Sequence, residues 1–264
     1  MFSVEPNEHI TFGIPYQDEH IAVVEKPARV PTQPGKGHQT DTLLNGLFSK
    51  WGKQLQNLGA ARDFGLLHRL DKDTSGLLIV GLRVQAYDKL REMFMQRTVR
   101  KFYWAICDGA PKNPTGVIRM PIEEGAGSAT GAGAKGQMKL ARIVRGGAGK
   151  PAITAYRVLE QSRLACLIEA RPVTGRLHQI RLHMEAIGIP VLGDTFYGPR
   201  RVHTASPRLA LHAHRIAFEH PMTGEPVDVR TDWPSDLRRT LRAMGLHRPG
   251  TSVSPRPLAE DAES

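Results

Sequence analysis

A cluster of charged and hydroxyl side chains stands directly before an apolar run in this chain. Residues 68–76 read His-Arg-Leu-Asp-Lys-Asp-Thr-Ser-Gly, and residues 77–80, Leu-Leu-Ile-Val, follow at once. The run has the length and the β-bias of a buried strand. A buried strand belongs to the core of a sheet, so the polar cluster is expected at one end of a rigid element. Groups placed there can be held in a fixed position.

The carboxylate of this cluster is the first candidate for chemistry. Asp71 has Arg69 and Lys72 as close neighbours in the sequence. Nearby positive charge favours the ionised form of a carboxyl group, and an ionised carboxylate suits a nucleophile or a general base. A turn with solvated ion pairs and a hydroxyl-rich cap accounts for the same residues equally well.

Hydrophobic periodicity predicts a chain of mixed secondary structure. Apolar, β-biased segments predict strands at 21–24, 77–80, 101–107, 153–160, 164–170, 210–218 and 227–229. Helical spacing predicts helices through 43–48, 85–96, 176–186 (capped by Thr174) and 236–244, while 14–20 reads as a turn. Strands gather in meanders with helices placed irregularly between them. This pattern predicts an α+β fold with a mixed, mostly antiparallel sheet and flanking helices and loops.

The chain is long enough for one large domain or two small ones. We expect an N-terminal extension (1–15), one main domain (16–247) and a tail (248–264), which is rich in Pro, Ser, Glu and Asp and is expected to be disordered. A Gly- and Ala-rich stretch at about 125–149 reads as a flexible surface insertion or a long hairpin tip. It is either an idle solvated loop or a basic arm that touches RNA.

The net charge of +10 indicates a polyanionic partner, because such a balance attracts nucleic acid and speeds its encounter. Of the 36 basic residues, 25 are arginine, whose planar fork pairs well with phosphate. Charge alone does not choose between RNA and DNA. No apolar run reaches the length of a membrane span, and the N-terminus has no secretion-signal pattern, so we expect a cytoplasmic protein without membrane contact.

Cysteines and histidines point to no metal. Cys107 and Cys166 lie in apolar strand-like segments, as buried reduced thiols of a cytoplasmic protein do. The histidine pairs 178/183 and 212/214 come without a His-Glu-x-x-His pattern or a matching third ligand. We therefore predict no metal site.

A second basic block lies at residues 174–183, Thr-Gly-Arg-Leu-His-Gln-Ile-Arg-Leu-His. A helix that starts here attracts anions through its free amides and dipole. Arg176 and Gln179 share a face. Arg181 lies on the flank of the apolar stripe, and a buried arginine needs a carboxylate, for which Asp71 is a natural candidate. A surface basic helix held by its apolar stripe is the alternative.

The motif His-Arg-Leu-Asp-x-x-Thr-Ser-Gly-Leu resembles the active-site motif of the RluA-type pseudouridine synthases, which are RNA-modifying enzymes. Two other blocks are similar to later motifs of that family: Lys101 to Ala105 (Lys-x-Tyr-x-Ala), and residues 174–194. The resemblance spans roughly residues 16–233 and implies the pseudouridine synthase-like catalytic fold, in the form without the small RNA-binding domain in front. Two positions depart from the family pattern. Leu177 replaces a threonine or serine, and Arg29 replaces a glycine, for which we expect a different backbone rather than a strained one.

The resemblance also implies roles for individual residues. Asp71 matches the catalytic aspartate, and Arg181 matches the arginine that pairs with it. Tyr103 matches the tyrosine that lines the uracil pocket and stacks on the base, an interaction worth ~1–3 kcal/mol; a core tyrosine is the alternative reading. Arg69 matches the arginine that helps open the RNA and fills the vacated space. Further candidates for contacts to RNA phosphates or bases are His68, Lys26, Lys101, Arg176 and Gln179, although a solvated lysine explains Lys26 nearly as well.

These expectations define an RNA pseudouridine synthase, an isomerase that turns a uridine of rRNA or of a tRNA stem-loop into pseudouridine after flipping it out of its stack. The reaction needs no cofactor, and we expect a monomer. Two rivals remain open. One is an RNA-binding protein of this fold without catalysis, against which intact Asp71, Tyr103 and Arg181 speak. The other is a glycosidase-like hydrolase that uses Asp73 as a second carboxylate.

Overall fold

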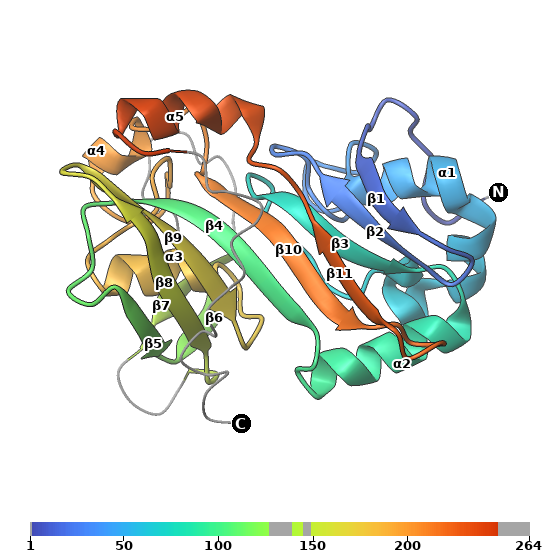
Figure 1. The fold of residues 1–264 in the computed structure, drawn as a ribbon. Helices are drawn as coiled ribbons and strands as arrows, with labels where there is room; N and C mark the ends of the chain where they lie inside the picture. Colours follow the sequence, from blue (N-terminus) through green and yellow to red (C-terminus); the bar gives the residue numbers. More distant parts are fainter. Residues whose placement is uncertain (1, 127–138, 145–148, 248–264) are drawn as a thin grey trace. The chain divides into compact units, whose positions relative to one another are not determined.

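The computed structural model describes residues 2–126, 139–144 and 149–247, drawn in colour in Figure 1. The chain forms two compact units, each built from separate stretches of sequence. The first comprises Met1–Lys101 and His212–Asp232, and the second comprises Phe102–Leu211 and Trp233–Ser264. The single catalytic domain predicted for 16–247 therefore contains parts of two units, and its boundaries stay a prediction.

The first unit is built on a five-stranded arrangement. Its strands follow one another in space as β1 (Gly13–Gln17), β2 (Ile21–Lys26), β3 (Ser75–Gly81), β10 (Leu211–Glu219) and β11 (Pro226–Arg230). The pairs are antiparallel except β3 with β10, which run parallel. Strand β3 therefore lies inside the sheet with a neighbour on each side.

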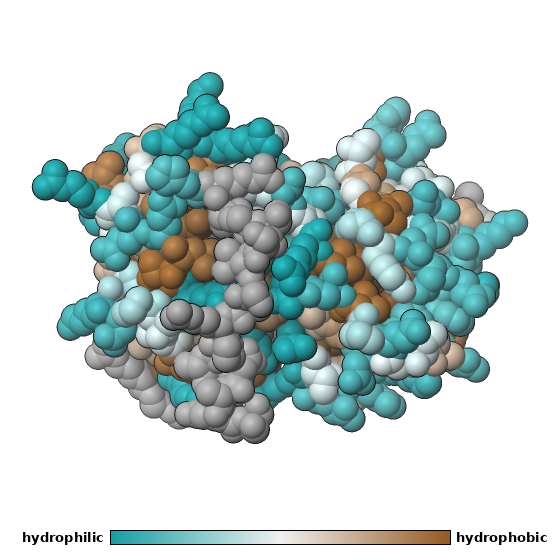
Figure 2. Space-filling model, in the orientation of Figure 1, coloured by the Kyte–Doolittle hydropathy of each residue, from teal (hydrophilic) through white to brown (hydrophobic). Residues whose placement is uncertain are grey.

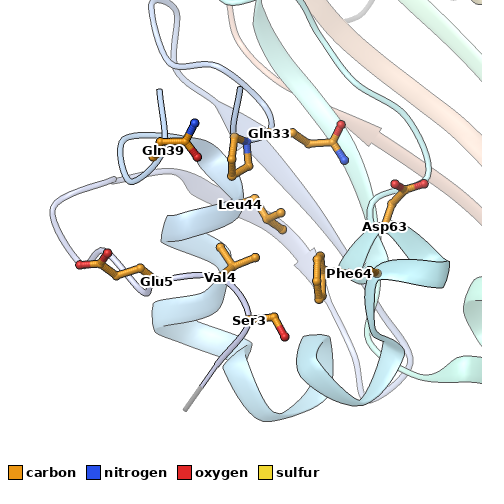
Figure 3. A pocket seen from close by; sticks show the side chains of 10 residues that line it. Ser3, Val4, Glu5, Gln33, Gln39, Leu44, Asp63 and Phe64 are labelled. Atoms are coloured by element: carbon orange, nitrogen blue, oxygen red, sulfur yellow. The ribbon is translucent and has the colours of Figure 1, made fainter. Parts of the chain in front are cut away.

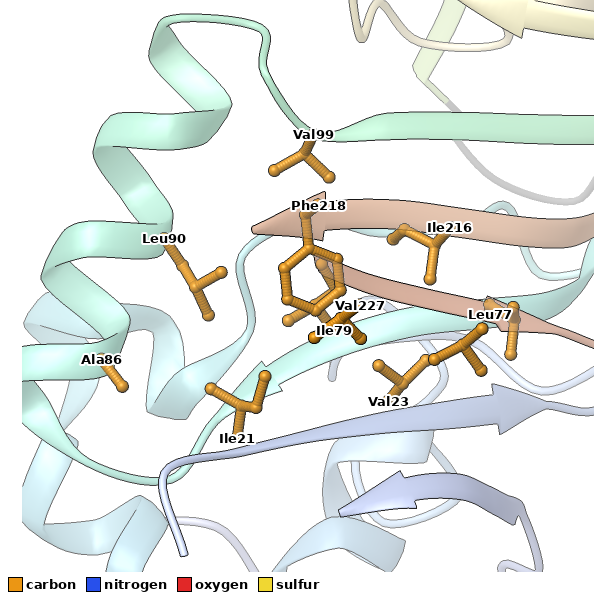
Figure 4. Packing of buried hydrophobic residues seen from close by; sticks show 11 residues of the cluster. Ile21, Val23, Leu77, Ile79, Ala86, Leu90, Val99, Ile216, Phe218 and Val227 are labelled. Carbon is orange, nitrogen blue, oxygen red and sulfur yellow. The ribbon is translucent and has the colours of Figure 1, made fainter. Parts of the chain in front are cut away.

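Both faces of β3 are covered, which explains its uninterrupted apolar sequence. Leu77 and Ile79 pack in a hydrophobic cluster with helix α2 (Val84–Met95), as Figure 4 shows. Leu78 and Val80 point to the opposite face and are fully buried as well. Helix α1 (Leu43–Leu58), which begins at the Thr42 capping box, and the short 3₁₀ helix η1 (Ala60–Gly65) complete the unit.

The second unit has its own antiparallel strands. Their spatial order is β4 (Arg100–Asp108), β9 (Ala165–Pro172), β8 (Ile153–Gln161) and β5 (Thr115–Arg119). A separate hairpin pairs β6 (Ile122–Ala126) with β7 (Lys139–Ile143). The helices are α3 (Gln179–Ala186), α4 (Arg200–His203), η2 (Ser235–Leu237) and α5 (Arg238–Ala243). Both units together confirm the predicted α+β class with a mostly antiparallel sheet.

Two local predictions are wrong. Residues 14–17 of the turn predicted at 14–20 belong to β1, whose Tyr16 lies opposite Val23 of β2. Pro15 does not prevent strand formation here, because β1 is an edge strand and an edge strand tolerates a residue without a backbone N–H group. Helix α3 begins at Gln179 rather than at Arg176, because His178 adopts a left-handed φ of 54° and ends the regular turn. Thr174 does not cap it.

Arg29 corrects a third expectation. The loop after Pro27 does require a left-handed residue at this point, since Arg29 has φ 67°. We expected a different backbone because a left-handed conformation costs a non-glycine residue roughly 1–2 kcal/mol. Arg29 therefore adopts the left-handed conformation in spite of this energetic cost.

The ends of the chain and the insertion are described in part. The predicted N-terminal extension packs on α1, where Val4 is buried and Asn45 donates from Nδ2 to the Glu5 carbonyl at 2.7 Å. The insertion predicted at 125–149 begins in β6, includes β7 and extends beyond the end of that strand. Its residues 127–138 and 145–148, and the tail 248–264, lie outside the described residues.

The visible surface is dominated by hydrophilic residues, and hydrophobic ones show only in limited patches (Figure 2). In the part of the chain that the structure describes, no helix combines the length and apolarity needed to cross a membrane. Across residues 2–126, 139–144 and 149–247, His, Cys, Asp and Glu side chains form no group of three suited to a metal ion.

Candidate active site

Asp71 lies in a short turn at the start of β3, half-buried, with fixed neighbours on both sides. The Thr74 N–H donates to the Asp71 carbonyl at 3.1 Å and closes the turn. On one side, Leu70 exchanges two hydrogen bonds with the Thr32 hydroxyl, which donates to its carbonyl at 2.8 Å and accepts from its N–H at 3.2 Å. The backbone that carries the carboxylate is thus tied to the loop that follows β2.

Lys26 secures the other side of Asp71. Its side chain is fully buried, and its ammonium group donates to the carbonyls of Pro27, Val30 and Lys72 at 2.8, 2.7 and 3.1 Å. An RNA contact requires an exposed head group, so neither this role nor the solvated lysine considered from the sequence fits its position. Lys26 instead joins the Pro27–Val30 loop to the motif loop next to Asp71.

The hydroxyl-rich end of the motif is anchored in the core. The Ser75 hydroxyl lies 2.9 Å from Nδ1 of His212, and Nε2 of the same histidine lies 2.7 Å from the Thr231 hydroxyl. All three residues are buried. Beside them, Gly76 has φ 117°, and a Cβ atom there would lie 2.2 Å from the Ala213 carbonyl oxygen. The Ser-Gly step therefore lets β10 approach β3 closely.

His68 is half-buried and packs in a cluster with Phe94 and Lys101, and its contact with RNA stays a prediction. Its Nε2 accepts the Ile79 N–H at 3.1 Å, so the proton of the neutral ring is on Nδ1, which is buried and has no hydrogen-bond partner among the described residues. The ring lies 5.1 Å from that of Phe94, and the Lys101 ammonium lies 5.4 Å from the same Phe94 ring. Burial and, secondly, the charge of Lys101 lower the pKa of His68 well below its usual range. Burial lowers the pKa of Lys101 to about 8.

Arg181 is buried, more completely than the partial burial that its position on the flank of the apolar stripe predicted. Its Nε and Nη2 donate to the two carboxylate oxygens of Asp194, both at 2.8 Å. The predicted pair with Asp71 stays a prediction, since Asp71 belongs to the first unit and Arg181 to the second. Reasoning from spacing missed Asp194, which lies 13 residues further along the chain. The Gly-Asp step at 193–194 was the available signal.

The other candidates of the second unit have different surroundings. Gln179 is buried, and its amide accepts from the Thr174 hydroxyl and the Arg176 N–H and donates to the Ile153 carbonyl. Arg176 is half-exposed and donates from Nε to the Pro151 carbonyl at 3.1 Å. Gln179 therefore shapes the loop before α3, while Arg176 remains accessible. Tyr103 is buried in β4 opposite Ala170, and its stacking role stays a prediction beside the alternative of a core tyrosine. Arg69, in contrast, is exposed.

Comparison with known proteins decides the family. A sequence model of the family described as RNA pseudouridylate synthase matches residues 20–186. The chain belongs to this family. The matched range contains the Asp71 motif, Tyr103 and the first part of the 174–194 block, with Arg181.

Individual proteins that are similar to this synthase support the same family assignment. A ribosomal large subunit pseudouridine synthase D from Zymomonas mobilis is 37% identical over 247 residues, which are 91% of this chain and 74% of the relative. An uncharacterized RNA pseudouridine synthase, YlyB, of Bacillus subtilis is 34% identical and covers 92% of this chain and 82% of its own. Among solved structures, the human RNA pseudouridylate synthase domain containing 4 has a TM-score of 0.68 at 25% identity, covering 90% of this chain and 95% of its own. The synthase is thus an RNA-modifying isomerase.

A pocket of about 420 Å³ also lies in the first unit of the synthase (Figure 3). Its wall includes Gln33, Leu44, Asp63 and Phe64, the last two in left-handed conformations with φ 45° and 50°. None of the motif residues 68–76 lines it. This pocket is therefore separate from the carboxylate that the motif positions.

Proposed function

We propose that this synthase isomerises specific uridines of large-subunit ribosomal RNA, with Asp71 as its catalytic carboxylate. The observation that carries the proposal is the anchoring of Asp71. Hydrogen bonds from Thr32 and Lys26 hold the residues directly before and after it, at the end of a strand buried on both faces. A carboxylate on so constrained a backbone is suited to meet a ribose in a defined orientation.

The reaction rearranges bonds within one nucleotide. The bond between N1 of uracil and C1′ of ribose breaks, the ring turns, and a bond forms between C5 and C1′. The hydrogen on C5 is released as a proton, and N1 takes one up, so no atom is lost and no electron changes hands. Asp71 either attacks the ribose or removes a proton from it; both roles need an ionised carboxylate.

The remaining residues of the proposal handle the RNA. A uridine in folded RNA must leave its stack before an enzyme reaches it. Arg69, which is exposed beside Asp71, is suited to fill the space that the base vacates. Tyr103 offers a stacking surface for the uracil, and Arg181 supplies a cation. Ribosomal RNA is favoured over a tRNA stem-loop because the similar protein of Zymomonas mobilis carries a ribosomal name.

The deciding test compares pseudouridine maps of total RNA from cells that carry the wild-type chain, lack it, or carry Asp71→Asn. We expect the same few rRNA sites to vanish in the deletion and in the Asp71→Asn cells. Asp73→Asn is the matched control, a carboxylate two residues further on, and is expected to keep those sites. Sites that vanish from tRNA instead would redirect the substrate, and free uracil would indicate hydrolysis. Sites that persist in every strain would favour a binding protein.

A further inference from the structure

The carboxylate of Asp194 forms a bidentate contact with the guanidinium of Arg181. Two parallel hydrogen bonds of 2.8 Å join Nε to Oδ2 and Nη2 to Oδ1. The two side chains are only 5% and 1% exposed, so water does not compete with either bond. A bidentate pair of this kind fixes the plane of the guanidinium as well as its position.

The carboxylate of Asp194 is itself immobilised. Its Oδ1 also accepts the N–H groups of Phe196 and Tyr197 at 2.9 and 3.1 Å. Before it, Gly193 has φ 75°, and a Cβ there would lie 2.0 Å from the Arg208 carbonyl oxygen. The backbone therefore passes Arg208 at a distance that only glycine permits, and Asp194 follows directly from this constrained point.

Two aromatic rings complete the surroundings of the guanidinium. The Cζ atom of Arg181 lies 5.1 Å from the ring centres of both Phe196 and Tyr197. The Tyr197 hydroxyl lies 2.8 Å from Nδ1 of His178 and donates to the Ala141 carbonyl at 3.1 Å. Residues 194–197 thus form a cradle, with a carboxylate in the plane of the guanidinium and rings beside it.

A buried ion pair adds little net stability, because desolvation of both charges offsets their attraction. We therefore infer a functional reason for it and propose that Asp194 is a positioning residue, which orients Arg181 for the reaction without touching the RNA. This inference rests on the proposed function, which assigns Arg181 a catalytic task. With Nε and Nη2 committed to Asp194, the orientation of the whole guanidinium group is set by the cradle and not by substrate binding.

The experiment measures tritium release from RNA labelled at C5 of uridine and separates kcat from KM. Asp194→Asn keeps an oxygen for the backbone N–H groups but places an NH₂ group against the arginine. We expect kcat to fall about 10- to 100-fold, as misplacement of a catalytic group does, with KM for RNA within about twofold of wild type. Asp194→Glu keeps the charge, shifts it by one methylene and should also lower kcat, which provides the test if Asp194→Asn does not fold.

The chain offers a matched control. Arg208 binds Asp236 through the same two nitrogens, at 2.6 and 2.9 Å, in the same unit. Asp236→Asn breaks that pair and should leave kcat within about twofold. A spectroscopic control is the Nε–H resonance of Arg181, expected to be slowly exchanging in the wild type and to lose its protection in Asp194→Asn.

A double variant separates the two proposals. In an Arg181→Lys background, Asp194→Asn should change kcat by less than about twofold, since the group that it positions is gone. Equal losses of kcat in Asp194→Asn and Asp236→Asn would overturn only the positioning role of Asp194. The same conclusion would follow if Asp194→Asn lowered kcat as much in the Arg181→Lys background as it does in the wild type. An Arg181→Lys enzyme with wild-type kcat would instead refute the catalytic task of Arg181, and with it this inference.

Discussion

At the scale of single residues, the neighbourhood of Asp71 depends on polar groups that are themselves buried. Lys26 is fully enclosed, and its ammonium group donates hydrogen bonds to three backbone carbonyls. A buried ammonium group is tolerated only when hydrogen bonds replace its water. The Lys26 ammonium group therefore joins the Pro27–Val30 loop to the motif loop, and the motif loop carries Asp71.

Substitution of Lys26 distinguishes a structural role from contact with RNA. Lys26→Met keeps the apolar stem but leaves three carbonyls without this donor, and an unsatisfied buried group costs about 1–3 kcal/mol. We expect the free energy of unfolding to fall by at least ~3 kcal/mol in urea titrations. The exposed Lys36→Met should change it by less than ~0.5 kcal/mol. Unaltered stability combined with weaker RNA binding would restore the RNA-contact hypothesis for Lys26.

His68 predicts a pH dependence of stability. Its pKa is lowered well below 6.5 in the folded state, chiefly by burial. Between the folded pKa and 6.5 the unfolded chain binds more protons, so the stabilisation is complete above pH 6.5 and is lost as the pH falls below it. We expect the wild type to lose about 1.4 kcal/mol per pH unit in this window relative to His68→Gln, whose amide oxygen can still accept the Ile79 N–H. Urea titrations at several pH values measure this, with the exposed His9→Gln as control. Parallel curves for wild type and His68→Gln would contradict the prediction.

At the scale of elements, glycine decides where β3 can begin. Gly76→Ala adds a Cβ 2.2 Å from the Ala213 carbonyl oxygen, at a φ of 117°. Strain and overlap with rigid backbone together should cost about 3 kcal/mol or more. Gly109→Ala, at φ 72° with no atom within 4 Å of the added Cβ, has the strain without the overlap and should cost about 1 kcal/mol. Thermal unfolding of both variants checks the difference, and equal losses would show that the approach of β10 can relax.

Elements with a strong hydrophobic period were predictable from sequence, and elements made by unusual backbone were not. The apolar run at 77–80 predicted β3, and helical spacing predicted α2 to within one residue of its ends. The left-handed conformations of His178 and Arg29 were not predicted, because neither residue type requires a positive φ. These positions are set by tertiary packing, which overrides local preference.

The site shows the same division. The motif predicted which carboxylate to examine, but local reasoning could not reveal that Lys26 turns inward or that Asp194 is a partner of Arg181. Both facts depend on contacts between segments distant in sequence. In each case a charged side chain binds another part of the protein itself, Lys26 through backbone carbonyls and Arg181 through Asp194.

At the scale of the whole molecule, the net charge of +10 governs binding to RNA more than any single residue does. Neutralised phosphates release counterions, so affinity for single strands falls with salt at a slope of about −0.7 per phosphate. Contact with about five phosphates predicts a slope near −3.5, which is roughly a hundredfold loss of affinity between 50 and 200 mM salt. Fluorescence anisotropy with a labelled rRNA stem-loop measures this dependence.

The same titration separates binding from catalysis when it is repeated with Asp71→Asn. A carboxylate neutralises no phosphate, so the variant should keep the salt slope, bind within about twofold of wild type at every salt concentration and lose its activity. Arg69→Ala is the contrasting variant, because an exposed arginine that meets a phosphate or the vacated stack should lower both affinity and slope. Loss of binding in Asp71→Asn would make Asp71 an RNA contact, whereas retained binding without isomerisation leaves the carboxylate its chemical role.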